Sequence, residues 1–222
     1  MRGAWASLLL LSSAASAWPV DMAEEVPRGA EQVRRVATVE WAESRDPAIV
    51  TAEVLPGNTE VLIVGKAPGA TQVLLYAEGQ FAVWRITVRE PGGRAVVASP
   101  EPALTAARKA CPGLKASLPA QERSLAVHVK DRACRGALRE LLRTDAFLAR
   151  DLHLVFEVAA LQDQLGAVTP ALTALGLKAR YLGAGLVLDG AVTPAAHRQA
   201  LWALFDAAVG RVALEDRTTR SP

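Results

Sequence analysis

The chain has 222 residues, about half of them apolar, and its 25 lysine and arginine residues against 23 aspartate and glutamate residues leave a formal net charge of +2. This length suggests one to three small domains, each with enough apolar residues for a hydrophobic core. A charge so close to neutral gives no electrostatic reason to expect nucleic acid as a partner.

The first 17 residues have the layout of a secretory signal peptide. Arg2 precedes a leucine-rich run, and Ala15-Ser16-Ala17 fits the small-x-small rule, so we expect cleavage between Ala17 and Trp18. The leucine-rich run is shorter than the roughly 20 apolar residues that a spanning helix needs, and no later segment reaches that length. We therefore expect an exported, periplasmic protein, soluble after cleavage, whose net charge falls to +1 with the loss of Arg2.

Residues 33–90 have the pattern of a small β-rich domain. Val50–Val54 alternates apolar with small or polar residues, and Val61–Val64 is a continuous apolar run that suits a strand buried on both faces. Val73–Leu75 and Phe81–Val88 are predicted to pair as a hairpin across a glycine-containing turn. We expect this hairpin to be an exposed edge that pairs with a strand of a neighbouring protein.

Two short motifs connect these strands. Asp46-Pro47-Ala48-Ile49 precedes the first strand, and Gly65-Lys66-x-x-Gly69-x-Thr71 follows the continuous apolar run. Together they resemble the N-terminal periplasmic domain of secretins from pilus-assembly and type II or type III secretion systems, in particular a Tad-type pilus secretin. The resemblance implies that Gly65, Lys66, Gly69 and Thr71 form the family's turn, in an envelope assembly protein without an active site.

One departure from that family lies at the start of the domain. Members of the family usually carry another strand before the Asp-Pro step. Residues 18–34 supply only polar sequence that contains proline, so we expect the first strand to be missing or divergent.

A linker at residues 91–102 leads into an internal repeat. A shift of 63 residues aligns residues 113–142 with residues 176–205 without a gap, with 11 identities over 30 positions. We therefore predict two modules that share one fold, at residues 103–158 and 159–215. Each module has the expected order α-β-β-α-β, so the predicted fold class is α+β: a small β-rich N-terminal domain followed by two tandem modules.

The second module shows this order most clearly. A helix is expected over Ala159–Leu175, strands over Leu177–Tyr181 and Leu186–Val192, and a second helix that Thr193 caps, with a last strand at Arg211–Leu214. A strand with a glycine at 190 that leads into an alanine-rich helix resembles BON domains and the KH-like modules of secretin rings. The first module has Val127 in place of that glycine.

Two cysteines remain in the exported chain, Cys111 and Cys134. An even count in an oxidising compartment favours a disulfide between the ends of the two helices of the first module. Two buried free thiols are the alternative. A CxxC redox pair and a cysteine zinc site do not fit the spacing or the count.

No sequence pattern points to catalysis or to a cofactor. A phosphate-binding loop around Gly65-Lys66 would need glycine where Glu60 stands and serine or threonine where Ala67 stands. His128, His153 and His197 lie in different elements, with His197 on a helix face that looks exposed, so we expect no metal site. We therefore expect a protein that is not an enzyme and needs no cofactor.

These observations predict a non-catalytic periplasmic component of a pilus-assembly or secretion apparatus. The expected partners are a secretin or other pilus and secretion components, with self-association and peripheral contact with the envelope as further modes and no nucleic acid. The first alternative is a BON-type envelope protein that binds phospholipid or peptidoglycan. The second is a periplasmic enzyme.

The first testable prediction concerns the N-terminal residue of the exported protein. Protein recovered from an envelope fraction should begin at Trp18, because the signal peptide is removed after Ala17. Intact-mass measurement and N-terminal sequencing check this, and a mature protein that retains Met1 would contradict it.

Overall fold

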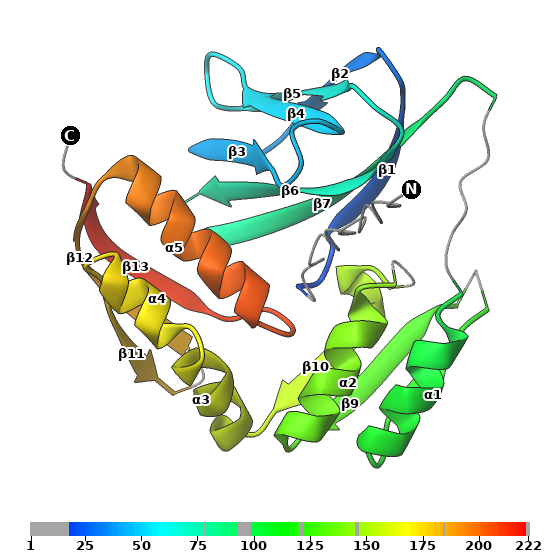
Figure 1. Ribbon diagram of the computed structural model, residues 1–222, viewed down its shortest axis with the longest axis vertical. Helices are drawn as coiled ribbons and strands as arrows, with labels where there is room; N and C mark the ends of the chain where they lie inside the picture. The colour runs from blue at the N-terminus through cyan, green and yellow to red at the C-terminus, as the bar shows by residue number, and fades with distance from the viewer. Residues whose placement is uncertain are drawn as a thin grey trace, which may run out of the picture.

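The structure is a computed structural model that describes residues 18–77, 79–92, 99–119, 122–144, 147–183 and 185–220. It confirms the α+β class: a seven-stranded domain is followed by two α/β modules (Figure 1). The predicted cleavage residue Ala17 lies outside the described residues. Below, domain 1 denotes residues 22–89, module 1 residues 101–156 and module 2 residues 158–220.

Domain 1 is a sandwich of two sheets. Its strands are β1 (Met22–Pro27), β2 (Glu31–Arg35), β3 (Trp41–Ser44), β4 (Val50–Val54), β5 (Glu60–Gly65), β6 (Gly69–Ala77) and β7 (Gln80–Arg89). One sheet has the order β1-β7-β6-β3 and the other β2-β5-β4. Alternate residues of the facing strands, among them Val61, Ile63, Val73 and Ile86, fill the space between the sheets.

We expected the first strand to be missing or divergent, and it is not missing. Residues 22–27 form β1, which pairs in parallel with β7 from Met22 opposite Trp84 to Pro27 opposite Arg89. An edge strand needs only one apolar face, and here Val26 is fully buried while Ala23 and Glu25 are exposed. Proline is tolerated at the end of such a strand. The domain therefore begins at Met22, ahead of the expected boundary at residue 33.

The hairpin β6–β7 is not the edge that we expected. β1 and β3 flank it on either side, so both of its strands are central in the sheet. The reason lies in β7, where Phe81 and Val83 face one side and Trp84 and Ile86 face the other. A hairpin with two apolar faces must be covered on both.

The two modules share one topology. Module 1 contains α1 (Glu101–Ala110), β8 (Lys115–Ser117), β9 (Ser124–Val129), α2 (Arg132–Leu142), η1 (Ala149–Asp151) and β10 (Leu152–Phe156). Module 2 contains α3 (Val158–Gly166), α4 (Thr169–Ala174), β11 (Lys178–Leu182), β12 (Gly185–Val192), α5 (Pro194–Ala207) and β13 (Leu214–Arg220). In each, the middle strand pairs antiparallel with the strand before it and parallel with the strand after α2 or α5.

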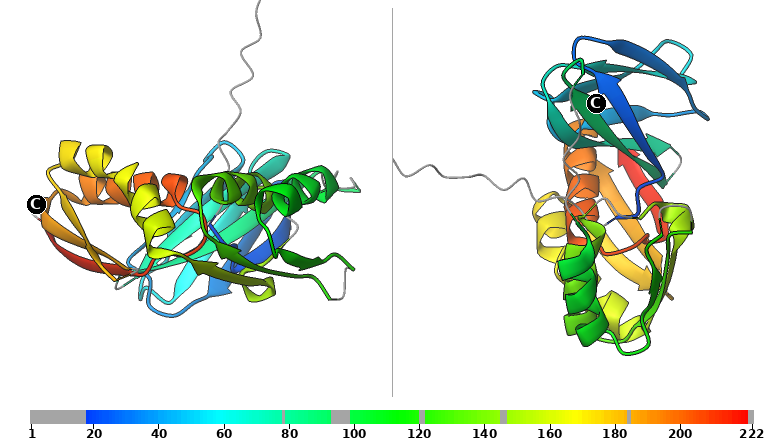
Figure 2. Two further views of the ribbon diagram at one scale, coloured as in Figure 1. Left: turned by 90° about the horizontal axis from the view of Figure 1, so that it is seen from below. Right: turned by 90° about the vertical axis from the view of Figure 1, so that its right-hand side faces the viewer.

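The register of the strands follows the sequence repeat. Ala116 lies opposite Leu125 in module 1, and Ala179 lies opposite Leu188 in module 2, both pairs related by the 63-residue shift. The parallel pairs differ by one residue, since Leu125 faces Leu152 whereas Leu188 faces Asp216. The helices of both modules lie on one side of their sheets (Figure 2). Each module sheet therefore has one covered face and one open face.

Two details of module 2 depart from expectation. The helix expected over 159–175 is two helices, α3 and α4, that meet at Ala167 and Val168. The last strand, β13, runs from Leu214 to Arg220, beyond both its expected range and the expected module boundary at 215. The predicted cap is confirmed, since the Thr193 hydroxyl accepts a hydrogen bond from the Ala196 amide, and Asp131 caps α2 in the same way by accepting from the Cys134 amide.

Cys111 and Cys134 form a disulfide, with their Cα atoms 4.7 Å apart. It ties the end of α1 to the first turn of α2, and both cysteines are buried in the core of module 1. A disulfide of this kind is characteristic of proteins in an oxidising compartment. Among the helices of the described residues, none combines the length and the apolar character that crossing a bilayer requires.

Candidate functional site at the junction of the domains

Domain 1 and module 2 share one hydrophobic core. Leu74, Tyr76, Phe81 and Val83 of the sheet of domain 1 are buried together with side chains of α5, β12 and β13. Module 1 has a core of its own, although Val209 from module 2 enters it. The sequence led us to expect three domains in a row, but the first and the third pack directly against each other (Figure 1).

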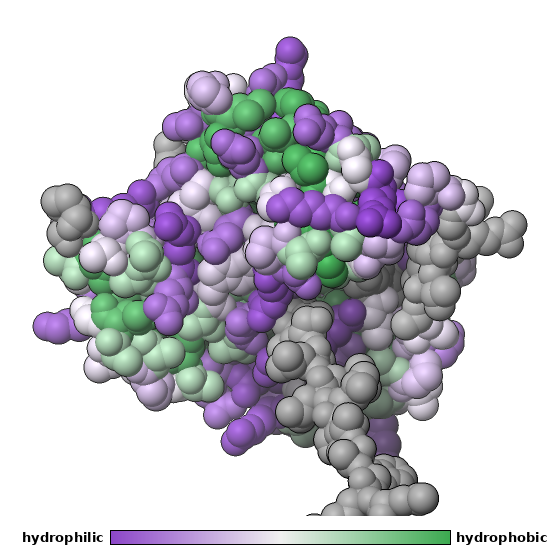
Figure 3. All heavy atoms as spheres, turned by 45° about the horizontal axis from the view of Figure 1, so that its top comes forward, coloured by the Kyte–Doolittle hydropathy of each residue, from purple (hydrophilic) through white to green (hydrophobic). Residues whose placement is uncertain are grey.

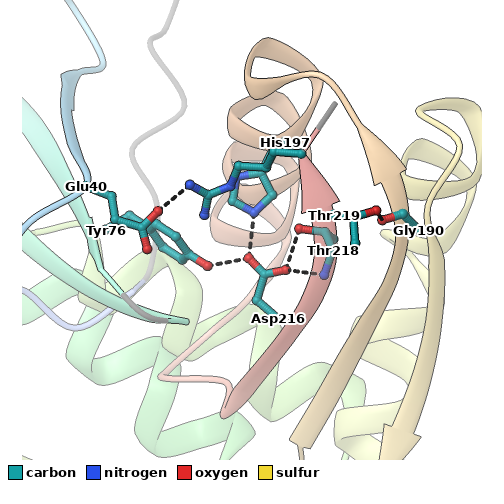
Figure 4. A network of polar contacts seen from close by, with 8 residues as sticks. Glu40, Tyr76, Gly190, His197, Asp216, Thr218 and Thr219 are labelled. Carbon is teal, nitrogen blue, oxygen red and sulfur yellow. Dashed lines mark hydrogen bonds and ion pairs between the residues drawn. The ribbon is translucent and has the colours of Figure 1, made fainter. Parts of the chain in front are cut away.

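A buried polar network lies at the edge of this shared core (Figure 4). The Tyr76 hydroxyl of domain 1 donates a hydrogen bond to the Asp216 carboxylate of β13, and His197 Nε2 of α5 lies 2.6 Å from the same carboxylate oxygen. The other oxygen of Asp216 accepts from the Thr218 amide and hydroxyl, at 3.0 and 2.7 Å. Each oxygen of this buried carboxylate therefore has two hydrogen-bond partners.

Burial and hydrogen bonding shift the pKa values of two groups in the network. Burial raises the pKa of Tyr76, and the neighbouring Asp216 carboxylate raises it further. Burial also acts to raise the pKa of Asp216, but hydrogen bonds from His197, Tyr76 and Thr218 outweigh it and hold that pKa well below its ordinary value. A general acid or base works best with a pKa near the operating pH. Both pKa values move away from neutral pH, and the hydrogen bonds of the network join domain 1 to module 2.

Charged side chains continue the junction towards solvent. Arg45 pairs with Asp206 and lies over the Trp202 ring, 5.4 Å from its centroid. The Trp202 indole nitrogen donates to Glu43 across the junction, at 3.0 Å. Arg220 pairs with Glu40 in the same way. Ion pairs this exposed contribute little each, so the shared core carries most of the stability of the junction.

The residues that follow the predicted cleavage site form a strap over the junction. The buried Trp18 ring packs against Phe81 of domain 1 and Phe205 of module 2, with centroids 5.5 and 6.0 Å apart. The Val20 carbonyl accepts a hydrogen bond from the Ala149 amide of module 1, at 2.7 Å.

Asp21 completes the strap. Its amide and carboxylate bond to the Val83 backbone at 2.8 Å, and Arg211 pairs with the same carboxylate. The four residues 18–21 therefore contact domain 1 and both modules.

The two modules meet through α2 and α3. Arg135 on α2 pairs with Asp163 on α3 at 2.8 Å, and Arg139 donates to the Asp206 carbonyl at 3.1 Å. Gln164 is fully buried, and its carbonyl oxygen accepts from the Val209 amide. These contacts fix module 1 beside module 2, with the last turn of α5 between them.

The family-motif turn is a structural unit of domain 1. The Thr71 hydroxyl accepts a hydrogen bond from the Asp46 amide at 3.1 Å, and the Lys66 amide donates to the Ile49 carbonyl at 2.8 Å. Gly69 lies against the Ile49 side chain, so the two motifs identified in the sequence contact each other. The turn carries the chain from β5 in one sheet to β6 in the other. Its exposed Lys66 side chain is the one member that faces outwards.

The histidines show what sequence reasoning missed. His197 was expected on an exposed helix face, but it is 1% exposed, because α5 is covered on that side by domain 1. The sequence around His197 carries only a weak signal for this burial, because the side chain that covers it, Tyr76, lies far away in the chain. His128 and His153 lie on β9 and β10 as expected. In the part of the chain that the structure describes, no three histidine, cysteine, aspartate or glutamate side chains gather as metal ligands.

No family model and no curated protein matches the chain. Among solved structures, domains 4 and 5 of the S-layer protein SbsC give a TM-score of 0.27 at 13% identity, over 31% of this chain and 47% of that one. Domains 1–6 of the surface layer protein SbsC give 0.28 at 10% identity, over 47% and 14% of the two chains.

The C-terminal domain of CdsD, the structural protein of the type III secretion system of Chlamydia trachomatis, gives a TM-score of 0.27 at 14% identity, over 62% of this chain and 71% of that chain. The chain thus has weak structural similarity to a secretion-system structural protein. All three likenesses are too weak to define a family.

Gly65→Ala should destabilise domain 1. A Cβ at this position would lie 2.9 Å from the Pro27 carbonyl oxygen and 3.1 Å from the Val26 side chain, so β1 must move. Overpacking of this kind costs about 1–3 kcal/mol of unfolding free energy, measured by urea denaturation. Gly136→Ala is the matched control, because nothing lies within 4 Å of its Cβ on helix α2. It should stabilise by about 0.5–1 kcal/mol, and equal effects at both sites would contradict the assigned role of Gly65.

Asp216→Asn should weaken the junction in a pH-dependent manner. At pH 7 we expect a loss of about 1–3 kcal/mol, because His197 and Tyr76 lose a charged partner. Since the folded-state pKa of Asp216 is lowered, its contribution is present above the ordinary aspartate pKa of about 3.9 and is lost as the pH falls below it. In urea denaturation the difference between the two proteins should stay constant from pH 7 to about pH 5 and begin to narrow only below the ordinary aspartate pKa of about 3.9. Asp189→Asn, which removes only an exposed pair with Arg180, should change stability little at any pH.

Proposed function

We propose that the protein is a non-catalytic periplasmic component of a pilus-assembly or secretin-associated secretion apparatus, and that it acts through contacts with other proteins. The observation that carries the proposal is where the polar groups of the chain lie and which parts they join. Three buried polar side chains, Tyr76, His197 and Asp216, join domain 1 to module 2, while the sheets of both modules keep one face open. A rigid body with open sheet faces suits a scaffold.

The sequence resemblance supports the same proposal. The residues that resemble the secretin N-terminal domain form a single packed turn, in which Thr71 contacts Asp46 and Gly69 contacts Ile49. The duplicated α-β-β-α-β modules follow it, as they do where secretin-ring modules are strung together. The disulfide in module 1 is consistent with export to the periplasm.

Deletion of domain 1 is a poor test of this function. Phe81 and Val83 cover part of the core of module 2, so removing residues 35–89 would expose that core and destabilise module 2. Surface positions on the intact chain are the better probes.

The proposed function can be tested by placing a photo-crosslinking side chain at an exposed apolar position. Val33, Val155 and Leu182 are 46%, 45% and 61% exposed and lie on domain 1, module 1 and module 2. Ultraviolet irradiation of intact cells should crosslink at least one of these variants to a secretin or to another pilus or secretion component. The same variants in a strain without the secretin, and cells kept in the dark, are the controls.

Two outcomes would overturn the proposal. Absence of any protein adduct at all three positions, together with tight binding of the purified protein to anionic phospholipid vesicles or to peptidoglycan, would favour the BON-type envelope protein. Turnover of an envelope substrate that Asp216→Asn abolishes would favour an enzyme.

A further inference from the structure

Helix α1 of module 1 buries very little apolar surface. Of its ten residues only Leu104 and Ala107 are buried, so one leucine is its single large hydrophobic anchor. A helix of this length is marginal in water on its own and depends on tertiary packing. The bond between Cys111 and Cys134 ties its C-terminal end to the first turn of α2. The disulfide therefore supplies an attachment that the apolar side chains of α1 do not.

The duplicated module shows the alternative to this disulfide. In the place of α1, module 2 has α3 and α4, and this segment puts three large apolar side chains into the shared core: Leu165, Val168 and Leu172. The 63-residue shift that relates the modules puts His197 at the position of Cys134, and module 2 contains no cysteine. One copy thus holds its first helical segment by hydrophobic burial, and the other holds it mainly by a covalent bond.

The disulfide is shielded from solvent in the folded protein. Cys111 is 1% exposed and Cys134 is 2% exposed, and both lie in the core of module 1. Thiol–disulfide exchange requires access to a sulfur atom, so a soluble thiol can attack this bond only when the module opens. Oxidation of the two thiols needs the same access. The bond therefore forms before α1 is fully packed, and packing then protects it.

We propose that the Cys111–Cys134 disulfide is a redox-dependent latch for α1, which closes once, in an oxidising compartment, and without which α1 does not stay packed on module 1. In the closing step the two thiols lose two electrons and two protons to a disulfide donor, whose own S–S bond is reduced to two thiols while the new bond forms. The core shared by domain 1 and module 2 contains neither cysteine and does not depend on this step. The inference goes beyond the proposed function, because it holds whichever partner the protein binds.

Release of α1 would change the surface of the molecule. On the face shown in Figure 3, hydrophobic side chains lie in patches separated by hydrophilic ones. An open latch would add apolar surface on module 1, because Leu104 shares the core of that module with Leu125 and Leu138. A fluorescent dye that binds exposed hydrophobic surface should therefore report the open latch.

Hydrogen exchange of the mature chain tests the latch. The protein is unfolded in urea and refolded either with oxidised glutathione or with an excess of reductant, and a thiol count confirms the state of the two cysteines. In the reduced protein the amides of α1 should exchange about a hundredfold faster, because the loop-closure constraint is lost. Dye fluorescence should rise in the same sample. Amides of β9, of the β6–β7 hairpin and of α5 should keep their protection in both states.

A paired variant separates the loss of the bond from other effects of the reductant. Cys111→Ala with Cys134→Ala should exchange like the reduced protein and should not respond to reductant. Equal protection of α1 in the oxidised and reduced proteins would overturn the inference, and so would a loss of protection over the whole of module 1, since the bond would then support the module rather than the helix.

Closing only once has a readout of its own. The disulfide of the folded, oxidised protein should resist a concentration of reductant that breaks it in urea, and equally fast reduction in both conditions would contradict the shielding of the bond. The crosslinking test of the proposed function uses the oxidised protein, so the two proposals can fail separately.

Discussion

The structure depends on the burial of the second face of the β6–β7 hairpin. One face closes the sandwich of domain 1, and the other, with Tyr76, Phe81 and Val83, forms a common core with α5 and β13 of module 2. Hydrophobic burial is the dominant favourable term in folding, and here it joins segments that are more than 100 residues apart. The Asp216 carboxylate then fixes the position of the two parts, because Tyr76 of domain 1 and His197 of module 2 bind the same oxygen.

Because the domains are joined in this way, their outer surfaces have fixed relative positions. The open sheet faces of domain 1 and of module 1 belong to one body rather than to parts on flexible linkers. Arg135 with Asp163, and Val20 with Ala149, extend the same connection to module 1. A scaffold of this kind presents several contact surfaces at a set spacing, which lowers the entropy lost when neighbours bind.

Local patterns in the sequence predicted much of the fold. The repeat predicted a shared topology, and the register of Ala116 with Leu125 and of Ala179 with Leu188 follows it. Cap residues and the disulfide were also correct, because they depend on short-range chemistry. What the sequence could not predict depends on distant contacts. β1 looked polar because an edge strand buries one face only, and His197 looked exposed because its cover comes from Tyr76, over 100 residues earlier.

The strap at residues 18–21 has a consequence for the order of folding. These residues are synthesised long before their partners, since Trp18 packs against Phe205, and Asp21 pairs with Arg211, 190 residues later in the chain. The contacts of the strap can therefore form only after nearly the whole chain has been made. Contacts of such long sequence separation slow folding. Module 1 depends least on these late contacts, because its core comes almost entirely from its own residues.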